Sequence, residues 1–230
     1  MNVAIIVAAG RGVRAGGEVP KQFRMVGGAP LILHTLRRFE ACAAVDEIVL
    51  VAPVEETNAL LATNAAELKK TARVVEGGAT RTESVWRGLE SLDARAVKLV
   101  AVHDGVRPFV TPEEIERTMR AAADVGAAVL CAPVVDTIKV CEEGRITETL
   151  VREKLRRALT PQCFRYELLR RAYERARDAG LEATDCSALV ELLDAQDASV
   201  AVVEGDARNI KITRPEDFAL AEILLKESKS

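Results

Sequence analysis

The chain has 230 residues, of which 49% are hydrophobic and 29% are charged, and its formal net charge is -3. This length suits one large α/β domain over residues 1–230, and the composition is that of a soluble globular protein. The slightly acidic balance argues against general nucleic-acid and membrane-surface binders, because both classes need a basic excess. An anionic ligand would have to be met by local positive charge.

No apolar run approaches the ~20 residues of a membrane span, and Arg11 interrupts the first apolar stretch before it resembles a signal peptide. We therefore expect a cytoplasmic protein with no membrane and no nucleic-acid partner. The five cysteines are scattered and include no CxxC pair, which indicates reduced thiols rather than disulfides or a zinc site. With only His34 and His103 besides, a histidine-based metal site is not expected.

The first candidate site follows the N-terminal apolar run. Residues 3–7 predict a strand that is buried on both faces of a parallel sheet. After it come Ala8, Ala9 and Gly10, and then a loop in which glycines alternate with Arg14 and Lys21. Small residues let the backbone bring its N–H groups close to a ligand, while the cations add positive charge. This combination predicts a polyphosphate site.

A dinucleotide-binding turn is the competing interpretation of the same loop. Gly10-x-Gly12 is followed by Ala15, which is a formal match to the glycine fingerprint of that turn. However, such a turn should enter its helix directly, whereas Pro20 intervenes here and no helical apolar period begins before Pro30. Dinucleotide binding is therefore the less favoured hypothesis.

The rest of the chain alternates between strand and helix patterns. This alternation predicts an α/β fold with a mostly parallel central sheet. The expected strands cover 47–51, 73–75, 97–102, 127–132 and 200–203. The expected helices begin near Pro30, cover 55–70, follow Thr80 and Thr111 as N-terminal caps, cover 166–179 and 184–193, and follow Pro215.

Three segments interrupt this alternation. Residues 76–79 form a second glycine loop, directly before a capping box of Thr80 and Glu83. Asp104 follows a central strand at its carboxyl end, where open α/β sheets bind ligands. Residues 134–161 contain two short alternating runs around a glycine turn, which predicts a β-hairpin arm that packs on a partner.

Seven segments of the chain, taken together and in order, resemble the 2-C-methyl-D-erythritol 4-phosphate cytidylyltransferase family. They are AAGRGVRAGGEVPKQF, GGATRTESV, VHDGVRPF, PVVDTIKV, ALTPQCF, TDCSALVE and EGDARNIKITRPEDF, and they span nearly the whole sequence. The resemblance implies a three-layer, Rossmann-like nucleotidyltransferase fold with helices on both faces of the sheet. It also implies transfer of a cytidylyl group from CTP to 2-C-methyl-D-erythritol 4-phosphate, with Mg²⁺ or another divalent cation as cofactor.

The resemblance also assigns roles to individual residues. Arg14 and Lys21 match the family's catalytic cations, and Asp104 matches a magnesium contact. The residues that match nucleotide-binding positions are Ala8, Ala9, Gly10, Gly78, Ser84, Asp104 and Lys211. The residues that match positions for the alcohol phosphate are Arg107, Thr137, Arg152 and Thr160. In the family the arm, here 134–161, reaches the neighbouring subunit's site, so a homodimer is implied.

The sequence departs from the family's pattern at several positions. Ala79 and Cys186 stand where acids are common, Arg156 replaces a tryptophan, and Gly105 with Val106 replaces two alanines. These departures leave the matched phosphate-binding residues in place. Two alternatives stay open: a ribitol-5-phosphate cytidylyltransferase, which resembles the nucleotide half, and a non-catalytic nucleotide-binding module.

Overall fold

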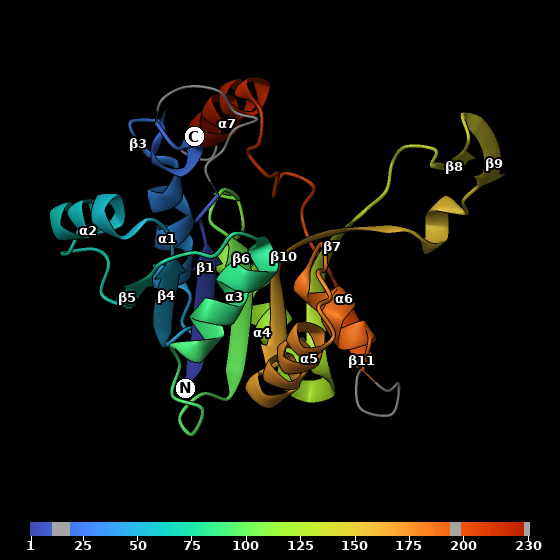
Figure 1. The fold of residues 1–230 in the computed structure, drawn as a ribbon. Helices are drawn as coiled ribbons and strands as arrows, with labels where there is room; N and C mark the ends of the chain where they lie inside the picture. The colour runs from blue at the N-terminus through green and yellow to red at the C-terminus, as the bar shows by residue number, and fades with distance from the viewer. Residues whose placement is uncertain (11–18, 194–198, 228–230) are drawn as a thin grey trace.

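The computed structural model describes residues 1–10, 19–193 and 199–227, and its centre is a mixed seven-stranded sheet (Figure 1). The strands lie in the order β11-β7-β10-β6-β1-β4-β5. Their bounds are β1 Asn2–Val7, β4 Glu47–Val51, β5 Thr71–Val75, β6 Leu99–Asp104, β7 Gly126–Pro133, β10 Arg156–Arg165 and β11 Ser199–Glu204.

The parallel strands place the loops that follow them at one edge of this sheet. β1 pairs in parallel with β4 and β6, β4 pairs in parallel with β5, and β11 does so with β7. β10 is antiparallel to both of its neighbours, β6 and β7. The prediction of a mostly parallel sheet is thus confirmed. The carboxyl ends of β1, β5 and β6 point the same way, so the loops that follow them can meet.

Helices cover both faces of the sheet (Figure 1). Strand side chains alternate between the faces, so β1 sends Ala4 and Ile6 to one hydrophobic cluster and Val3 and Ile5 to the other. The first cluster takes in α1 and α4 and the second takes in α3, α5 and α6. The helices are α1 Leu31–Ala41, α2 Val54–Thr63, α3 Arg81–Glu90, α4 Pro112–Val125, α5 Tyr166–Asp178, α6 Cys186–Glu191 and α7 Pro215–Glu227.

A third, smaller cluster joins the C-terminal helix to an N-terminal hairpin. Phe218, Ala221 and Leu225 of α7 are buried with Val26 of β2 (Met25–Val26) and with Leu31. β2 pairs antiparallel with β3 (Ala29–Pro30), and the turn's Gly27 N–H donates to the Glu222 carboxylate at 2.7 Å. α7 therefore holds the segment that follows η2 (Lys21–Phe23), which carries a candidate cation.

Helix ends follow the capping residues that the sequence supplies. At α4 the Thr111 side chain accepts from the Glu114 N–H and the Glu114 carboxylate accepts from the Thr111 N–H, as expected for a capping box. The predicted helix over 55–70 was wrong in its second half, since α2 ends at Thr63. There the Asn64 side chain donates to the Leu60 carbonyl at 2.8 Å and satisfies the last turn.

The predicted hairpin projects away from the body of the molecule (Figure 1). β8 (Lys139–Glu142) and β9 (Arg145–Thr149) form a separate two-stranded sheet, and η3 (Arg152–Lys154) leads back to the body. We call residues 134–155 the arm, because residues 156–161 already belong to β10 of the central sheet.

Among the described residues, no helix is long and apolar enough to cross a membrane. The cytoplasmic location and the absence of a nucleic-acid partner stay predictions.

Candidate active site

The candidate site lies where the chain changes direction across the sheet. From β1 the chain runs outward through β4 to β5, and it then returns to the other side of β1 with β6. Open α/β sheets bind ligands at such a switch point, outside the carboxyl ends of the strands. Val7 is paired with Asp104 here, and the Gly105 N–H donates to the Val7 carbonyl at 2.8 Å. Register alone therefore puts Asp104 beside the end of β1, which Ala8, Ala9 and Gly10 follow.

A cavity of about 780 Å³ opens at this point. It collects the ends of β1, β5 and β6, the start of α3, η2 and a segment before α7. Its lining includes most of the residues that the sequence picked out: Ala8, Ala9, Gly10, Lys21, Gly78, Ser84, Asp104 and Lys211. The buried Gln22 and the half-buried Arg81, to which the sequence assigned no role, line it too.

Glycine allows the two loops to meet in this cavity. A Cβ on Gly77 would lie 1.9 Å from the Ala9 Cβ, which no packing tolerates. In the same loop the Gly78 N–H donates to the Ser84 hydroxyl at 3.0 Å, and that hydroxyl donates to the Thr80 carbonyl at 2.8 Å. Ser84 therefore shapes the second glycine loop, and any contact to a base would have to share its oxygen.

Asp104 is the charged centre of the site. Its Oδ1 lies 3.3 Å from Arg81 Nε, and its Oδ2 lies 3.2 Å from Arg107 Nε and 2.9 Å from Lys211 Nζ. Three cations around one carboxylate leave an excess of two positive charges, and the cavity lining adds one further cation, Lys21, and one further acid, Glu76, so the excess stays at two. This local excess is what a polyphosphate needs from a chain that is slightly acidic as a whole.

The ionisation of Asp104 follows from these neighbours. Burial on its own would raise the pKa of the carboxyl group, because a charge loses its hydration there. The charges of Arg81, Lys211 and Arg107 outweigh burial and hold the pKa of Asp104 far below its ordinary value. The residue is therefore an anion at neutral pH, and acid–base catalysis is not its task.

A buried network supports Asp104 from behind. The Asp104 N–H donates to Thr160 Oγ1 at 3.2 Å, and Thr160 Oγ1 lies 2.9 Å from His103 Nδ1. His103 Nε2 lies 3.1 Å from the Arg107 carbonyl, so Nε2 carries the proton and Nδ1 accepts from the Thr160 hydroxyl. His103 is fully buried, which lowers its pKa to about 4 and keeps the ring neutral. These contacts make His103 structural, and they engage the hydroxyl of Thr160.

Arg107 faces the same network. Its Nη1 donates to the Asn209 carbonyl at 2.9 Å, and the Asn209 side chain donates to the Thr160 carbonyl at 2.9 Å. The side chain of Arg107 is 12% exposed and lies outside the cavity lining. Geometry therefore shows Arg107 orienting Asp104, while a direct substrate contact stays a prediction.

The predicted site residues Arg107, Thr137, Arg152 and Thr160 do not line the cavity. Arg14 lies outside the described residues. Thr137 and Arg152 are exposed on the arm, and Arg152 Nη1 donates to the Val135 carbonyl at 3.1 Å within the arm itself. The arm extends away from the body of its own chain (Figure 1), so these two residues do not reach this cavity.

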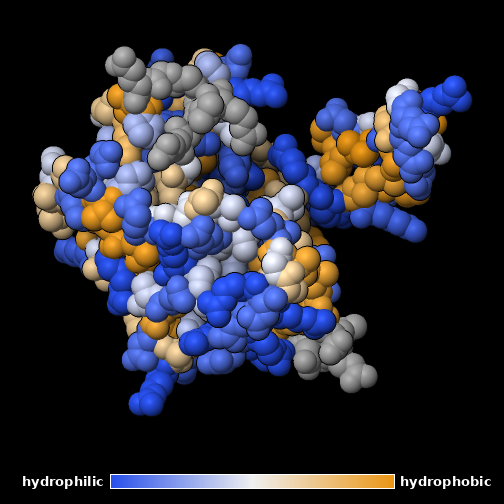
Figure 2. Space-filling model, in the orientation of Figure 1, coloured by the Kyte–Doolittle hydropathy of each residue, from blue (hydrophilic) through white to orange (hydrophobic). Residues whose placement is uncertain are grey.

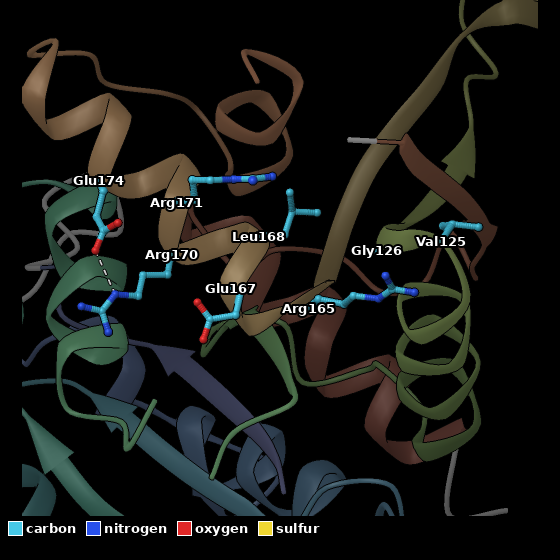
Figure 3. A pocket seen from close by; sticks show the side chains of 8 residues that line it. All are labelled: Val125, Gly126, Arg165, Glu167, Leu168, Arg170, Arg171 and Glu174. Atoms are coloured by element: carbon cyan, nitrogen blue, oxygen red, sulfur yellow. Dashed lines mark hydrogen bonds and ion pairs between the residues drawn. The ribbon is translucent and has the colours of Figure 1, made fainter. Parts of the chain in front are cut away.

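A second hollow at the opposite end of the sheet does not suit a polyphosphate. Its volume is about 450 Å³, and Arg165, Arg170 and Glu174 are among its lining residues (Figure 3). Arg170 pairs with Glu174 at 2.8 Å on the surface of α5, and Arg165 donates to the Ala123 and Asp124 carbonyls. Its described lining contains Gly126 but no glycine loop, and it lies away from the switch point of the sheet, so the cavity around Asp104 is the better candidate.

The donors present can hold a divalent cation only together with a ligand. Described residues contain no group of three or more histidines, cysteines or acids that would form a metal cage. Both oxygens of Asp104 already contact cations. Mg²⁺ is often held by one or two carboxylates plus substrate phosphates, so Asp104 fits as a single protein ligand if the phosphates supply the others.

Comparison with known proteins bears on this site. The family model of 2-C-methyl-D-erythritol 4-phosphate cytidylyltransferase matches residues 2–227. The chain belongs to this family. A relative with that name from Solibacter usitatus is 43% identical in an alignment of 240 positions, which covers 99% of this chain and 97% of the relative. The prediction of cytidylyltransferase membership is confirmed.

Solved structures of the cytidylyltransferase family agree with the fold. The 4-diphosphocytidyl-2C-methyl-D-erythritol synthase of Anaerococcus prevotii superimposes with a TM-score of 0.86 at 31% identity, covering 98% of this chain and 96% of that one. The cytidylyltransferase of Thermus thermophilus gives a TM-score of 0.74 at 37% identity, covering 97% of this chain and 98% of that one. The predicted nucleotidyltransferase fold is therefore confirmed.

Proposed function

We propose that this chain transfers the cytidylyl group of CTP to 2-C-methyl-D-erythritol 4-phosphate in non-mevalonate isoprenoid precursor synthesis. The products are pyrophosphate and 4-diphosphocytidyl-2-C-methyl-D-erythritol. One observation carries the proposal: in a chain of this family, a glycine-lined cavity with an excess of positive charge lies at the sheet's switch point. CTP is the anion that this cavity would hold.

The chemistry needs positioning more than covalent catalysis. A phosphate oxygen of the alcohol phosphate attacks the α-phosphorus of CTP, a new P–O bond forms, and the bond to the leaving pyrophosphate breaks. Negative charge spreads over the phosphoryl oxygens in the transition state, so fixed cations stabilise it. We assign this task to Lys21 and to Arg14, with Lys211 holding the phosphates from the Asp104 side.

Backbone groups would hold the nucleotide. Ala8, Ala9 and Gly10 lie at the end of β1, and Gly78 of the second loop lines the same cavity. A glycine loop offers N–H and C=O groups at fixed positions, and these distinguish a base from its relatives. A divalent cation bound by Asp104 and the phosphates would neutralise part of their charge.

The alcohol phosphate would be held across a dimer. Val135, Ile146 and Val151 of the arm are 77%, 65% and 56% exposed, and Figure 2 shows hydrophobic surface gathered on the arm. A two-stranded hairpin is only marginally stable on its own, so a second copy of the chain is the natural cover for these side chains. We infer that Thr137 and Arg152 of each arm reach the cavity of the partner chain. Thr160 and Arg107 of the chain that forms this cavity would complete the substrate site.

Pyrophosphate release tests this function. The purified chain with CTP and Mg²⁺ is assayed with 2-C-methyl-D-erythritol 4-phosphate and, in parallel, with ribitol 5-phosphate. We expect rapid release with the first acceptor and little with the second. The Lys21→Ala variant should release pyrophosphate about 10²–10³-fold more slowly. Faster release with ribitol 5-phosphate would favour the alternative enzyme, and CTP binding without release would favour a non-catalytic module.

A further inference from the structure

Arg81 lies between two parts of the chain that are far apart in sequence. It is the first residue of α3, directly after the second glycine loop, and its side chain is 22% exposed in the cavity lining. Its Nε reaches Asp104 Oδ1 at 3.3 Å on β6, and its Nη1 reaches Cys186 Sγ at 3.4 Å on α6. One planar guanidinium therefore bridges the charged centre of the site and a helix from the C-terminal half.

The Cys186 end of this bridge is held firmly. The Tyr173 hydroxyl donates to the same sulfur at 3.2 Å, and both Tyr173 and Cys186 are buried. The Cys186 N–H donates to Gln162 Oε1 at 2.9 Å, and Gln162 Nε2 donates to Asp185 Oδ2 at 2.8 Å. Since Gln162 lies on β10 next to β6, Cys186 has a fixed position relative to Asp104.

The Asp104 end needs such a bridge. Oδ2 accepts from both Arg107 and Lys211, whereas among the described residues only Arg81 contacts Oδ1. Without that contact the carboxylate could turn about its Cβ–Cγ bond, and Lys211 would lose its defined position. A lysine at 81 would keep the charge but, as a single ammonium on a flexible stem, could not hold both contacts in one plane.

We propose that Arg81 is a positioning residue of the transfer reaction: anchored by Cys186, it fixes the Asp104 carboxylate and through it aims Lys211 at the phosphates. Cys186 then serves as the anchor on α6 that holds the far end of the guanidinium. This inference rests on the proposed function, because the reaction it serves is cytidylyl transfer.

A double-mutant cycle tests the proposal. Arg81→Lys retains the charge, so we expect the KM for CTP to change by less than about threefold while kcat falls about 10–100-fold. In a Lys211→Ala background the same substitution should cost almost nothing further in kcat, because the side chain that Arg81 aims is gone. Equal losses in both backgrounds, or an unchanged kcat in Arg81→Lys, would overturn the proposal.

Cys186 gives a second test that does not depend on Arg81 variants. Cys186→Ser keeps an acceptor for the guanidinium and should retain more of kcat than Cys186→Ala. Cys163→Ala is the matched control, because it removes a sulfur that is equally buried, on β10 but in the other core cluster. If Cys163→Ala lowers kcat as much as Cys186→Ala, the effect is general destabilisation and the anchoring role is wrong.

The activity of the wild-type chain distinguishes a failure of the proposed function from a failure of the positioning role of Arg81. If this chain releases no pyrophosphate from CTP and 2-C-methyl-D-erythritol 4-phosphate, the proposed function fails. If it does release pyrophosphate and Arg81→Lys does not affect kcat, only the positioning role fails.

Discussion

His103 lies behind Asp104 with no exposed surface, and it hydrogen-bonds at both ring nitrogens. Burial lowers its pKa from 6.5 to about 4. Between these values the unfolded chain binds a proton that the folded chain does not, so stability rises with pH. The contribution is complete above about pH 6.5 and is lost as the pH falls toward 4; in total it amounts to about 3 kcal/mol.

Urea unfolding at pH 7.5 and at pH 4.5 measures this contribution. We expect the free energy of unfolding of wild type to fall by about 2 to 3 kcal/mol more than that of His103→Asn between these pH values. The variant lacks the titrating ring but keeps the carboxylates that also lose stability in acid, so it is the proper reference. Parallel losses in the two proteins would show that His103 is charged in the fold or that its site opens in acid.

Individual residues also show which contacts in the site can be predicted from the sequence. Lys211 and Asp104 could be paired in advance only through the family's motifs, because more than a hundred residues separate them and no local pattern links them. The contact between Arg81 and Cys186 of α6 cannot be predicted from sequence spacing, because 105 residues separate the two. The signal for Arg81 was an arginine at the first helical position directly after a glycine loop, where a cation is close to whatever the loop binds.

At the scale of elements, the close approach of two loops builds the nucleotide cavity. Gly77 lies against Ala9, and a Cβ there would sit at 1.9 Å from the Ala9 Cβ. We expect Gly77→Ala to push the loops apart and to raise the KM for CTP about tenfold or more, because displacements near 1 Å are costly in such sites. Steady-state kinetics with CTP varied at a saturating concentration of the alcohol phosphate would measure this.

Gly180→Ala is a suitable control for this change. Gly180 has a φ of +63, and a Cβ added there would meet no atom within 4 Å, so alanine costs backbone strain of about 1 kcal/mol without touching the cavity. Both variants should lose stability, and only Gly77→Ala should lose affinity for CTP. A comparable rise in KM for Gly180→Ala would mean that the loops respond to stability rather than to contact.

The end of a helix can be predicted from the sequence where contacts between nearby side chains and the backbone determine it. The capping box at Thr111 and the glycine after α4 are sequence signals with a direct backbone consequence. The end of α2 differs from the prediction because Asn64 continues a helix-compatible run and becomes a cap only when its side chain folds back on Leu60. In the described central sheet only β10 runs antiparallel to its neighbours, and its direction depends on how the chain returns from the arm, which is a tertiary property.

On the scale of the whole molecule, the proposed function requires that the arm of a second chain completes the cavity. Lys21 and Lys211 line it, whereas Arg152 lies on an arm that extends away from the body (Figure 1). If a symmetric dimer exchanges its arms, each site combines the body of one subunit with the arm of the other. Arg152→Ala should then raise the KM for the alcohol phosphate far more than the KM for CTP. Equal increases would count against its placement.

Mixed dimers decide whether the arm acts within its own chain or on its partner. Lys21→Ala damages the body's half of a site, and Arg152→Ala damages the arm's half. When the two variants are coexpressed with different affinity tags, about half of the dimers combine one of each, and one of their two sites receives an intact body and an intact arm. Because Arg152→Ala acts on the KM for the alcohol phosphate, activity is measured as kcat/KM at a low concentration of that substrate, where the variant alone is nearly inactive. We therefore expect about a quarter of the wild-type kcat/KM in the unfractionated mixture. Purification through both tags should raise this to about half.

The pairing of Lys21→Ala with Lys211→Ala is the matched control, because both changes damage the body and no intact combination can form. That mixture should stay as inactive as its components. An arm that serves its own chain predicts the same silence from the Lys21→Ala and Arg152→Ala mixture. If only the mixture of Lys21→Ala and Arg152→Ala recovers activity, Arg152 must act in the partner's site. If dimers purified through both tags show no recovered activity, the shared site is refuted.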